Sequence, residues 1–109
     1  MTFDQSWLTA AVETSADRPP TGLHGTGQLL IGKEKHVAVC IEDGRVVGES
    51  QGTPDCEMPF SKPQAEAFFD GRLKLSVEYM RGDLKPTGST AAIVAVIDAL
   101  DALAEQRSH

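Results

Sequence analysis

Two adjoining stretches decide the fold: Gly71-Arg-Leu-Lys-Leu-Ser-Val-Glu-Tyr-Met-Arg-Gly82-Asp-Leu-Lys-Pro-Thr-Gly88 and the apolar segment from Thr90 to Gln106. The first is divided by glycines and holds few side chains that catalyse reactions. In the second, large apolar side chains recur at helical spacing, which predicts a helix that is apolar over most of its circumference. They are Ile93, Val96, Ile97, Leu100 and Leu103, and we expect the solvent side to be marked by Asp98, Asp101, Glu105 and Gln106.

The chain before residue 61 contains several strand patterns. Apolar residues occupy 29–31, and in two further segments apolar residues alternate with other types, which is the period of half-buried strands. The alternating residues are Val37, Val39 and Ile41, then Cys56, Met58 and Phe60. Between them, Asp43-Gly44 predicts a type I′ hairpin turn, with residues 45–50 returning as the partner strand.

Helices are expected before and after these strands in the chain. Residues 4–14 are expected to form a helix with one apolar stripe and with Asp4 as its N-cap. A connector rich in glycine and proline follows over residues 16–27. After the strands, Ser61 and Gln64 form a capping box at the start of a helix that Gly71 ends.

The end of the chain completes the outline of the fold. Residues 73–81 fit a short helix or an extended link, and residues 83–87 a last strand that Pro86 places at a sheet edge. Strands grouped before helices indicate the α+β class. A length of 109 residues indicates one domain over residues 1–109.

Charge and hydropathy restrict the partners. The formal charge is −6 and the basic residues are scattered, which argues against a nucleic-acid partner and against adhesion to anionic membranes. No apolar run is long enough for a transmembrane helix, so we expect no stable membrane insertion. Because the N-terminus shows no signal-peptide pattern, we expect a cytoplasmic protein.

Catalytic and metal-binding patterns are weak. The span Gly27 to Lys33 has the skeleton of a phosphate-binding loop, but Glu34 stands where a magnesium-binding Ser or Thr is required. Gly25-Thr26-Gly27 is only part of a dinucleotide fingerprint. The histidines and the cysteines Cys40 and Cys56 form no triad or metal-ligand spacing, and we interpret the cysteines as reduced, buried apolar residues. We therefore expect no enzyme activity, no metal and no cofactor.

The order of several motifs resembles the sterol carrier protein (sterol-binding) domain over roughly residues 37 to 103. The resemblance is carried by Asp43-Gly44, Asp55-Cys-Glu-Met, Phe60-Ser61, Phe69-x-Gly71, Met80-x-Gly82-x-Leu84-Lys85-x-x-Gly88 and the closing helix. It implies a five-stranded, mostly antiparallel sheet covered by helices, with an apolar tunnel under the C-terminal helix. It also implies binding of a sterol, fatty acid, acyl chain or other lipid, without catalysis, metal or nucleotide.

Within the region that the resemblance indicates, our candidates for ligand-binding residues are Phe69, Leu75, Val77, Met80, Ile93, Val96, Ile97 and Leu100. An empty apolar tunnel of about 300 Å³ would cost on the order of 7 kcal/mol, comparable to the stability of a whole domain. We therefore expect the region around the C-terminal helix to be collapsed or mobile without ligand, or the protein to purify with lipid bound. Two alternatives remain: an accessory or enzyme component acting on a hydrophobic biosynthetic intermediate, with Glu57 or Tyr79 facing the cavity, and a ligand-free homodimerisation module.

Overall fold

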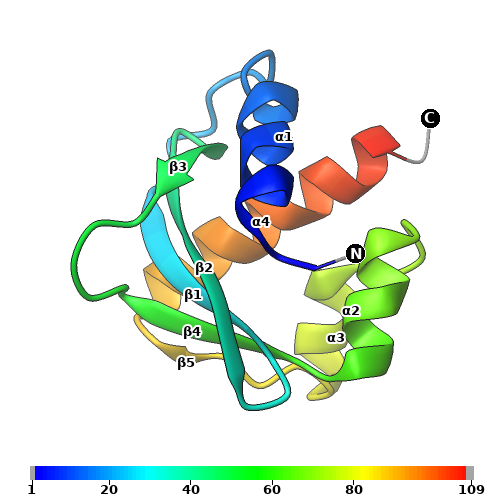
Figure 1. Ribbon diagram of the computed structural model, residues 1–109. Helices are drawn as coiled ribbons and strands as arrows, with labels where there is room; N and C mark the ends of the chain where they lie inside the picture. The colour runs from blue at the N-terminus through cyan, green and yellow to red at the C-terminus, as the bar shows by residue number, and fades with distance from the viewer. Residues whose placement is uncertain (1, 108–109) are drawn as a thin grey trace.

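The computed structural model describes residues 2–107, with side chains described for residues 2–105. A five-stranded sheet is covered on one face by the helices (Figure 1). The elements, in chain order, are α1 (Gln5–Ser15), β1 (Gly25–Ile31), β2 (Glu34–Glu42), β3 (Arg45–Glu49), β4 (Cys56–Phe60), α2 (Lys62–Phe69), α3 (Leu75–Arg81), β5 (Thr87–Gly88) and α4 (Thr90–Arg107). The α+β class and the five strands are confirmed.

The sheet is mixed, with the strand order β3-β2-β1-β4-β5. The expectation of a five-stranded, mostly antiparallel sheet is confirmed, and the one parallel pairing of the described strands involves β4. That strand pairs with β1, in parallel, whereas β1–β2, β2–β3 and β4–β5 are antiparallel. Alternation along β4 shows only which of its side chains are buried. It carries no information on the neighbouring strand or the direction of pairing.

The predicted turn between β2 and β3 is confirmed by its backbone angles. Asp43 has φ of 52° and Gly44 has φ of 76°, as both central residues of a type I′ turn require.

Two strand lengths differ from expectation. β1 begins at Gly25, inside the predicted connector, and β5 contains only Thr87 and Gly88, so Asp83 to Pro86 are not strand. The edge position of this strand is confirmed.

The helix ends follow local rules. Asp4 accepts a hydrogen bond from the Trp7 backbone N–H at 2.9 Å, and both halves of the Ser61–Gln64 capping box are formed. Residues 75–81 are helical, and Gly82 ends that helix with φ of 81°. Of the helices that the structure describes, none combines the length and the apolar character that a bilayer crossing requires.

The main core lies between the sheet and α4, and two glycines of β1 bring the two layers close together. A Cβ atom at Gly25 would lie 2.7 Å from the Ala92 Cα, and one at Gly27 would lie 2.9 Å from a Val96 methyl. Both distances are shorter than van der Waals contact. The Gly25-Thr26-Gly27 sequence, which resembles part of a dinucleotide fingerprint, therefore serves helix packing.

Candidate ligand-binding groove between α3 and α4

A groove of about 430 Å³ runs between α3 and α4. Its apolar wall is formed by Tyr79 and Met80 of α3 and by Val94, Ile97 and Ala102 of α4. Its polar boundary is formed by Arg18, Lys74, Ser76, Asp98, Asp101 and Glu105. The volume falls in the lower part of the range for small-molecule pockets.

Exposed large apolar side chains gather around this groove. Five such residues are exposed among those described: Val47, Val77, Tyr79, Met80 and Val94. All except Val47 lie on α3 or α4, and Met80 is 87% exposed. Isolated apolar residues on a surface need no explanation, but a cluster beside a groove is typical of a binding surface.

The eight predicted ligand-binding residues fall into three groups. Only Met80 and Ile97 line the groove. Val77 is exposed beside it, on the outer side of α3, at 39%. The others belong to the core or pack against it: Phe69, Leu75, Ile93, Val96 and Leu100.

Buried side chains of α3 and α4 belong to one core cluster behind the groove. Leu75, Val96 and Leu100 have no exposed surface, so no water-sized void adjoins them. Since empty apolar volume costs about 24 cal/mol per Å³, this closed packing is strongly favoured over an empty tunnel. A ligand that entered the interior would have to displace these side chains.

Asp101 of α4 fixes the start of α3. Its two carboxylate oxygens accept hydrogen bonds from the backbone N–H groups of Leu75 at 2.6 Å and Ser76 at 3.1 Å. The N-cap residue, Lys74, provides no side-chain cap, so Asp101 supplies the missing acceptors from another helix. We had placed Asp101 on the solvent side of its helix, and this was wrong, because it is 8% exposed. The side chain of Gln106 lies outside the described residues.

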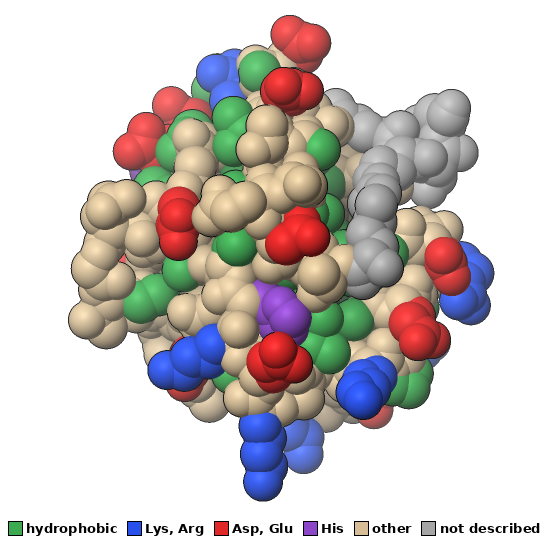
Figure 2. Space-filling model, in the orientation of Figure 1, with side chains coloured by type: hydrophobic (Ala, Val, Ile, Leu, Met, Phe, Trp, Pro, Cys, Tyr) green, Lys and Arg blue, Asp and Glu red, His purple; other side chains and the backbone are tan. Residues whose placement is uncertain are grey.

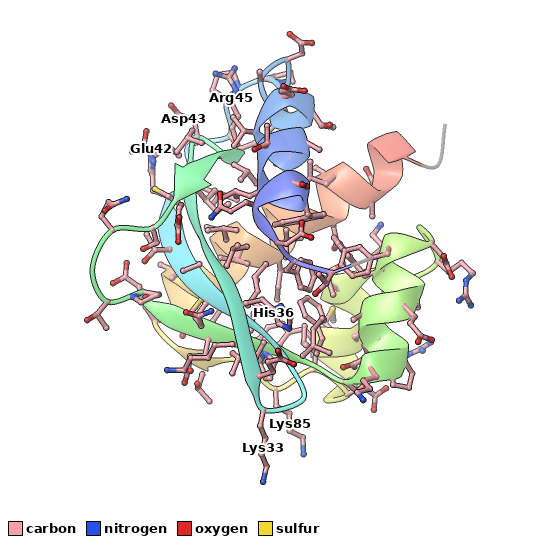
Figure 3. All side chains as sticks on the ribbon, viewed as in Figure 1. Lys33, His36, Glu42, Asp43, Arg45 and Lys85 are labelled. Atoms are coloured by element: carbon pink, nitrogen blue, oxygen red, sulfur yellow. The ribbon has the colours of Figure 1, made fainter. Side chains whose placement is uncertain are left out.

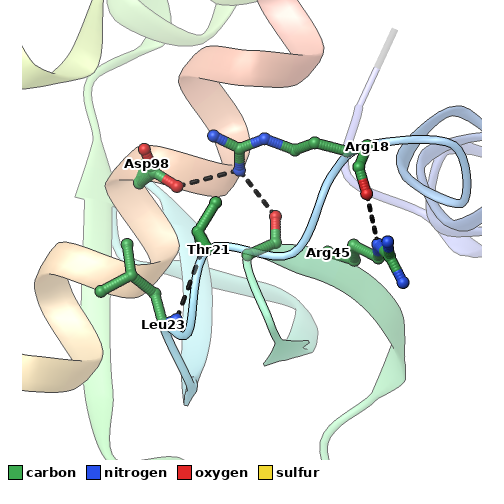
Figure 4. A network of polar contacts seen from close by, with 6 residues as sticks. Arg18, Thr21, Leu23, Arg45 and Asp98 are labelled. Carbon is green, nitrogen blue, oxygen red and sulfur yellow. Dashed lines mark hydrogen bonds and ion pairs between the residues drawn. The ribbon is translucent and has the colours of Figure 1, made fainter.

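Arg18 of the connector lies at the Asp98 end of the groove. Figure 4 shows its polar contacts. Its Nη1 donates to an Asp98 carboxylate oxygen at 2.9 Å and to the Gly44 carbonyl at 2.7 Å. The Arg45 Nε donates to the Arg18 carbonyl at 2.6 Å. Arg18 thus joins α4 to the β2–β3 turn. Near the opposite end, Lys74 and Glu105 form a 3.7 Å ion pair, so charges of both signs are paired along the boundary.

A second hollow, of about 440 Å³, lies along α1. Its described lining comes from the N-terminal segment and α1, with Leu103 as the contribution of α4. Its lining combines polar side chains with apolar ones, namely Thr2, Asp4, Ser6 and Thr14 with Trp7, Ala10, Ala11 and Leu103. We favour the α3–α4 groove as the candidate site, although the two volumes are similar, because the exposed apolar cluster adjoins it.

Titratable and nucleophilic side chains show little convergence. Among the described residues, no group of three or more His, Cys, Asp or Glu could hold a metal ion. Glu57 is exposed on β4, away from the groove, whereas Tyr79 lines it. His36 packs near Phe3 and its Nδ1 lies 3.2 Å from the Thr2 hydroxyl (Figure 3), also away from the groove.

Cys56 is expected to react slowly with alkylating reagents in the folded protein. Burial, followed by the nearby carboxylates of Asp55 and Glu57, raises its pKa from 9.0 to about 11. Because the thiolate is the nucleophile, alkylation of a Cys40→Ser variant by iodoacetamide at pH 8 should be at least about a hundredfold slower when folded than in urea. The raised pKa also means that the stability contribution of Cys56 is complete below pH 9 and is lost as the pH rises toward 11. Equal alkylation rates in the two states would contradict this assignment.

The sequence matches no protein-family model, and it matches none of the curated proteins significantly. Solved structures are similar. The crystal structure of sterol carrier protein 2 aligns over 96% of this chain and 95% of that chain, with a TM-score of 0.68 and 19% identity. This chain has the sterol carrier protein 2 fold. The resemblance seen in the sequence is thereby confirmed at the level of the fold.

Two further structures with the sterol carrier protein 2 fold support the assignment. The conserved hypothetical protein TT1886 from Thermus thermophilus aligns over 96% of this chain and 86% of its own, with a TM-score of 0.65 and 22% identity. Palmitated SCP2L2 from Aedes aegypti aligns over 89% of this chain and 94% of its own, with a TM-score of 0.57 and 13% identity. At these identities the likeness describes the backbone and not the ligand.

Proposed function

We propose that this protein binds a hydrophobic small molecule, such as a sterol, fatty acid, acyl chain or other lipid, at the groove between α3 and α4. The observation that carries the proposal is the clustering of Tyr79, Met80 and Val94, all exposed, along the groove. The palmitated state of the Aedes aegypti neighbour lends support, because that protein has the same fold. Binding needs no cofactor, since removing apolar area from water gains about 25 cal/mol per Å².

The proposed route into the interior starts at the groove. Ile97 lines the groove and, at 6% exposure, also belongs to the core. Leu75 packs in the same core at the start of α3. A ligand chain that entered between α3 and α4 would therefore pass directly from the groove to the core side chains. Separation of the two helices would open this route, and Asp101 is the contact that holds the start of α3 against α4.

Val94→Asp is expected to weaken lipid binding by at least about tenfold, because it places a charge on the apolar wall. The measurement is uptake of a fluorescent fatty acid and a fluorescent sterol, together with mass spectrometry of lipid extracted from freshly purified protein. Val94 is 43% exposed, so the fold should survive, whereas Ile97→Asp would bury a charge in the core.

Val47→Asp is the matched control, because Val47 is 45% exposed and lies on β3. It should bind lipid as the unmodified protein does. Equal binding by both folded variants would remove the groove as the site. If the unmodified protein neither carries nor takes up lipid, lipid binding itself is wrong.

One observation favours an accessory or enzymatic role on a hydrophobic intermediate. Tyr79, one of the two titratable residues considered for that role, lines the groove. Tyr79→Phe leaves the apolar wall intact, so a binding protein should retain its lipid affinity. A loss of turnover in the presence of the neighbouring enzymes of a pathway, at unchanged affinity, would support the enzymatic alternative.

A further inference from the structure

The charge of this chain is unevenly distributed. Residues 72–85 contain four Lys or Arg and two Asp or Glu, a net charge of +2 within a chain of net charge −6. Charge is also unevenly distributed on the face shown in Figure 2, where most Lys and Arg side chains lie in the lower half of the view and most acidic side chains in the upper half. The negative net charge of the whole chain argued against adhesion to anionic membranes. It does not describe the local charge around α3, which is positive.

The outward side of α3 is apolar and basic. Leu75 has no exposed surface and defines the inward side, while Val77 and Met80, three residues apart, are 39% and 87% exposed. Arg81 follows four residues after Val77 and is exposed on the same side. The solvent-facing side of a helix in a water-soluble protein is normally polar. Exposed apolar residues with basic neighbours are instead typical of helices that lie on membranes.

The cations at the end of α3 are available to a partner. Among the described residues, neither Arg81 nor Lys85 forms an ion pair, whereas Lys74 pairs with Glu105. Lys85 projects from the same end of the molecule as Lys33 of the β1–β2 turn (Figure 3). Lys85 follows Arg81 by four residues in the chain, so both cations come shortly after the exposed apolar residues of α3.

We propose that the outward side of α3, formed by Val77, Met80 and Arg81, docks with Lys85 on the surface of an anionic lipid bilayer. Val77 and Met80 would enter the boundary between headgroups and acyl chains, and the two cations would contact anionic headgroups. A protein partner fits less well, because stable protein interfaces bury about 800 Å² on each side and this apolar face consists of two side chains. The docking is superficial and reversible, and it requires no membrane-spanning helix.

Flotation with phosphatidylcholine vesicles, with and without phosphatidylserine, tests the proposal. The unmodified protein should float with phosphatidylserine vesicles and be released when the salt rises from about 0.1 M to about 1 M, which shortens the screening length from about 10 Å to 3 Å. A Val77→Ser/Arg81→Gln variant should bind at least about tenfold more weakly, since each cation near such a surface contributes about fivefold. Val47→Ser, which removes a comparably exposed valine on β3, should bind normally.

Three results would overturn the proposal: equal binding to neutral vesicles, equal losses in the α3 and β3 variants, or a dimer in light scattering that Val77→Ser dissociates. The last would assign the face to a second copy of the chain.

This inference goes beyond the proposed ligand binding, and the two fail separately. Neither Val77 nor Arg81 lines the groove, so the α3 variant should retain uptake of a fluorescent fatty acid from solution even when vesicle binding is lost.

Discussion

Gly27→Ala is expected to destabilise the protein by about 2 kcal/mol, with a fall in melting temperature on the order of 10 °C. The new methyl would lie 2.9 Å from a Val96 methyl and 3.1 Å from the Cys56 sulfur. Val96 is fully buried and its branched side chain has few alternative rotamers, so α4 or β1 has to shift. Thermal and urea unfolding followed by circular dichroism measure the loss.

A double-mutant cycle shows whether the contact with Val96 is the cause. Val96→Ala removes the clashing methyl and should itself cost about 2 kcal/mol by leaving a cavity. If α4 packs on Gly27 as described, the double variant should cost about as much as Val96→Ala alone, a coupling of roughly 1–2 kcal/mol. Strictly additive losses would mean that the close approach of β1 and α4 is not what restricts the size of the side chain at position 27.

Asp101→Ala is expected to cost about 3 kcal/mol and to loosen α3 selectively. The substitution leaves the backbone N–H groups of Leu75 and Ser76 without their acceptors, and Leu75 is fully buried. Charge-assisted hydrogen bonds of this kind contribute about 1.5–3 kcal/mol, and an unsatisfied buried donor adds a desolvation cost. Denaturant unfolding gives the total, and hydrogen exchange at residues 75–81 shows where protection is lost.

Asp98→Ala is the control, one helical turn earlier on α4. Asp98 pairs with Arg18, and its side chain is 36% exposed, so its loss should cost less than about 1 kcal/mol. It should leave exchange in α3 unchanged. Equal losses at the two positions, or unchanged α3 protection in Asp101→Ala, would show that Asp101 does not hold α3 in place.

Most helix ends and one turn could be predicted because their causes are local. The Ser61–Gln64 capping box and the positive φ angles of Asp43 and Gly44 follow from residues adjacent in sequence. The alternation of Cys56, Met58 and Phe60 also identified which face of β4 is buried. The ordering of that strand beside β1 was not predictable in this way, because an alternating pattern is the same for either neighbour and either direction.

The candidate groove was predicted only in part. Apolar character alone could not separate Met80, which is exposed on α3, from Leu100, which fills the core. Arg18 and Val94 were absent from the predicted site, and Tyr79 was named only for the enzymatic alternative. These three residues come from segments far apart in the chain. Asp98 and Asp101 have the same chemistry and lie three residues apart, yet only Asp101 meets the start of α3.

Patterns within the chain were sufficient for the class of fold, the burial pattern of β4 and the resemblance to sterol carrier proteins. These depend on periodicity and on turn and cap residues, which act over a few positions. Four features required the folded molecule: the parallel pairing of β4 with β1, the close packing of α4 on Gly25 and Gly27, the anchoring of α3 by Asp101, and the groove itself. Each of these depends on distances between segments that are remote in sequence, and those distances are established only when the whole core packs.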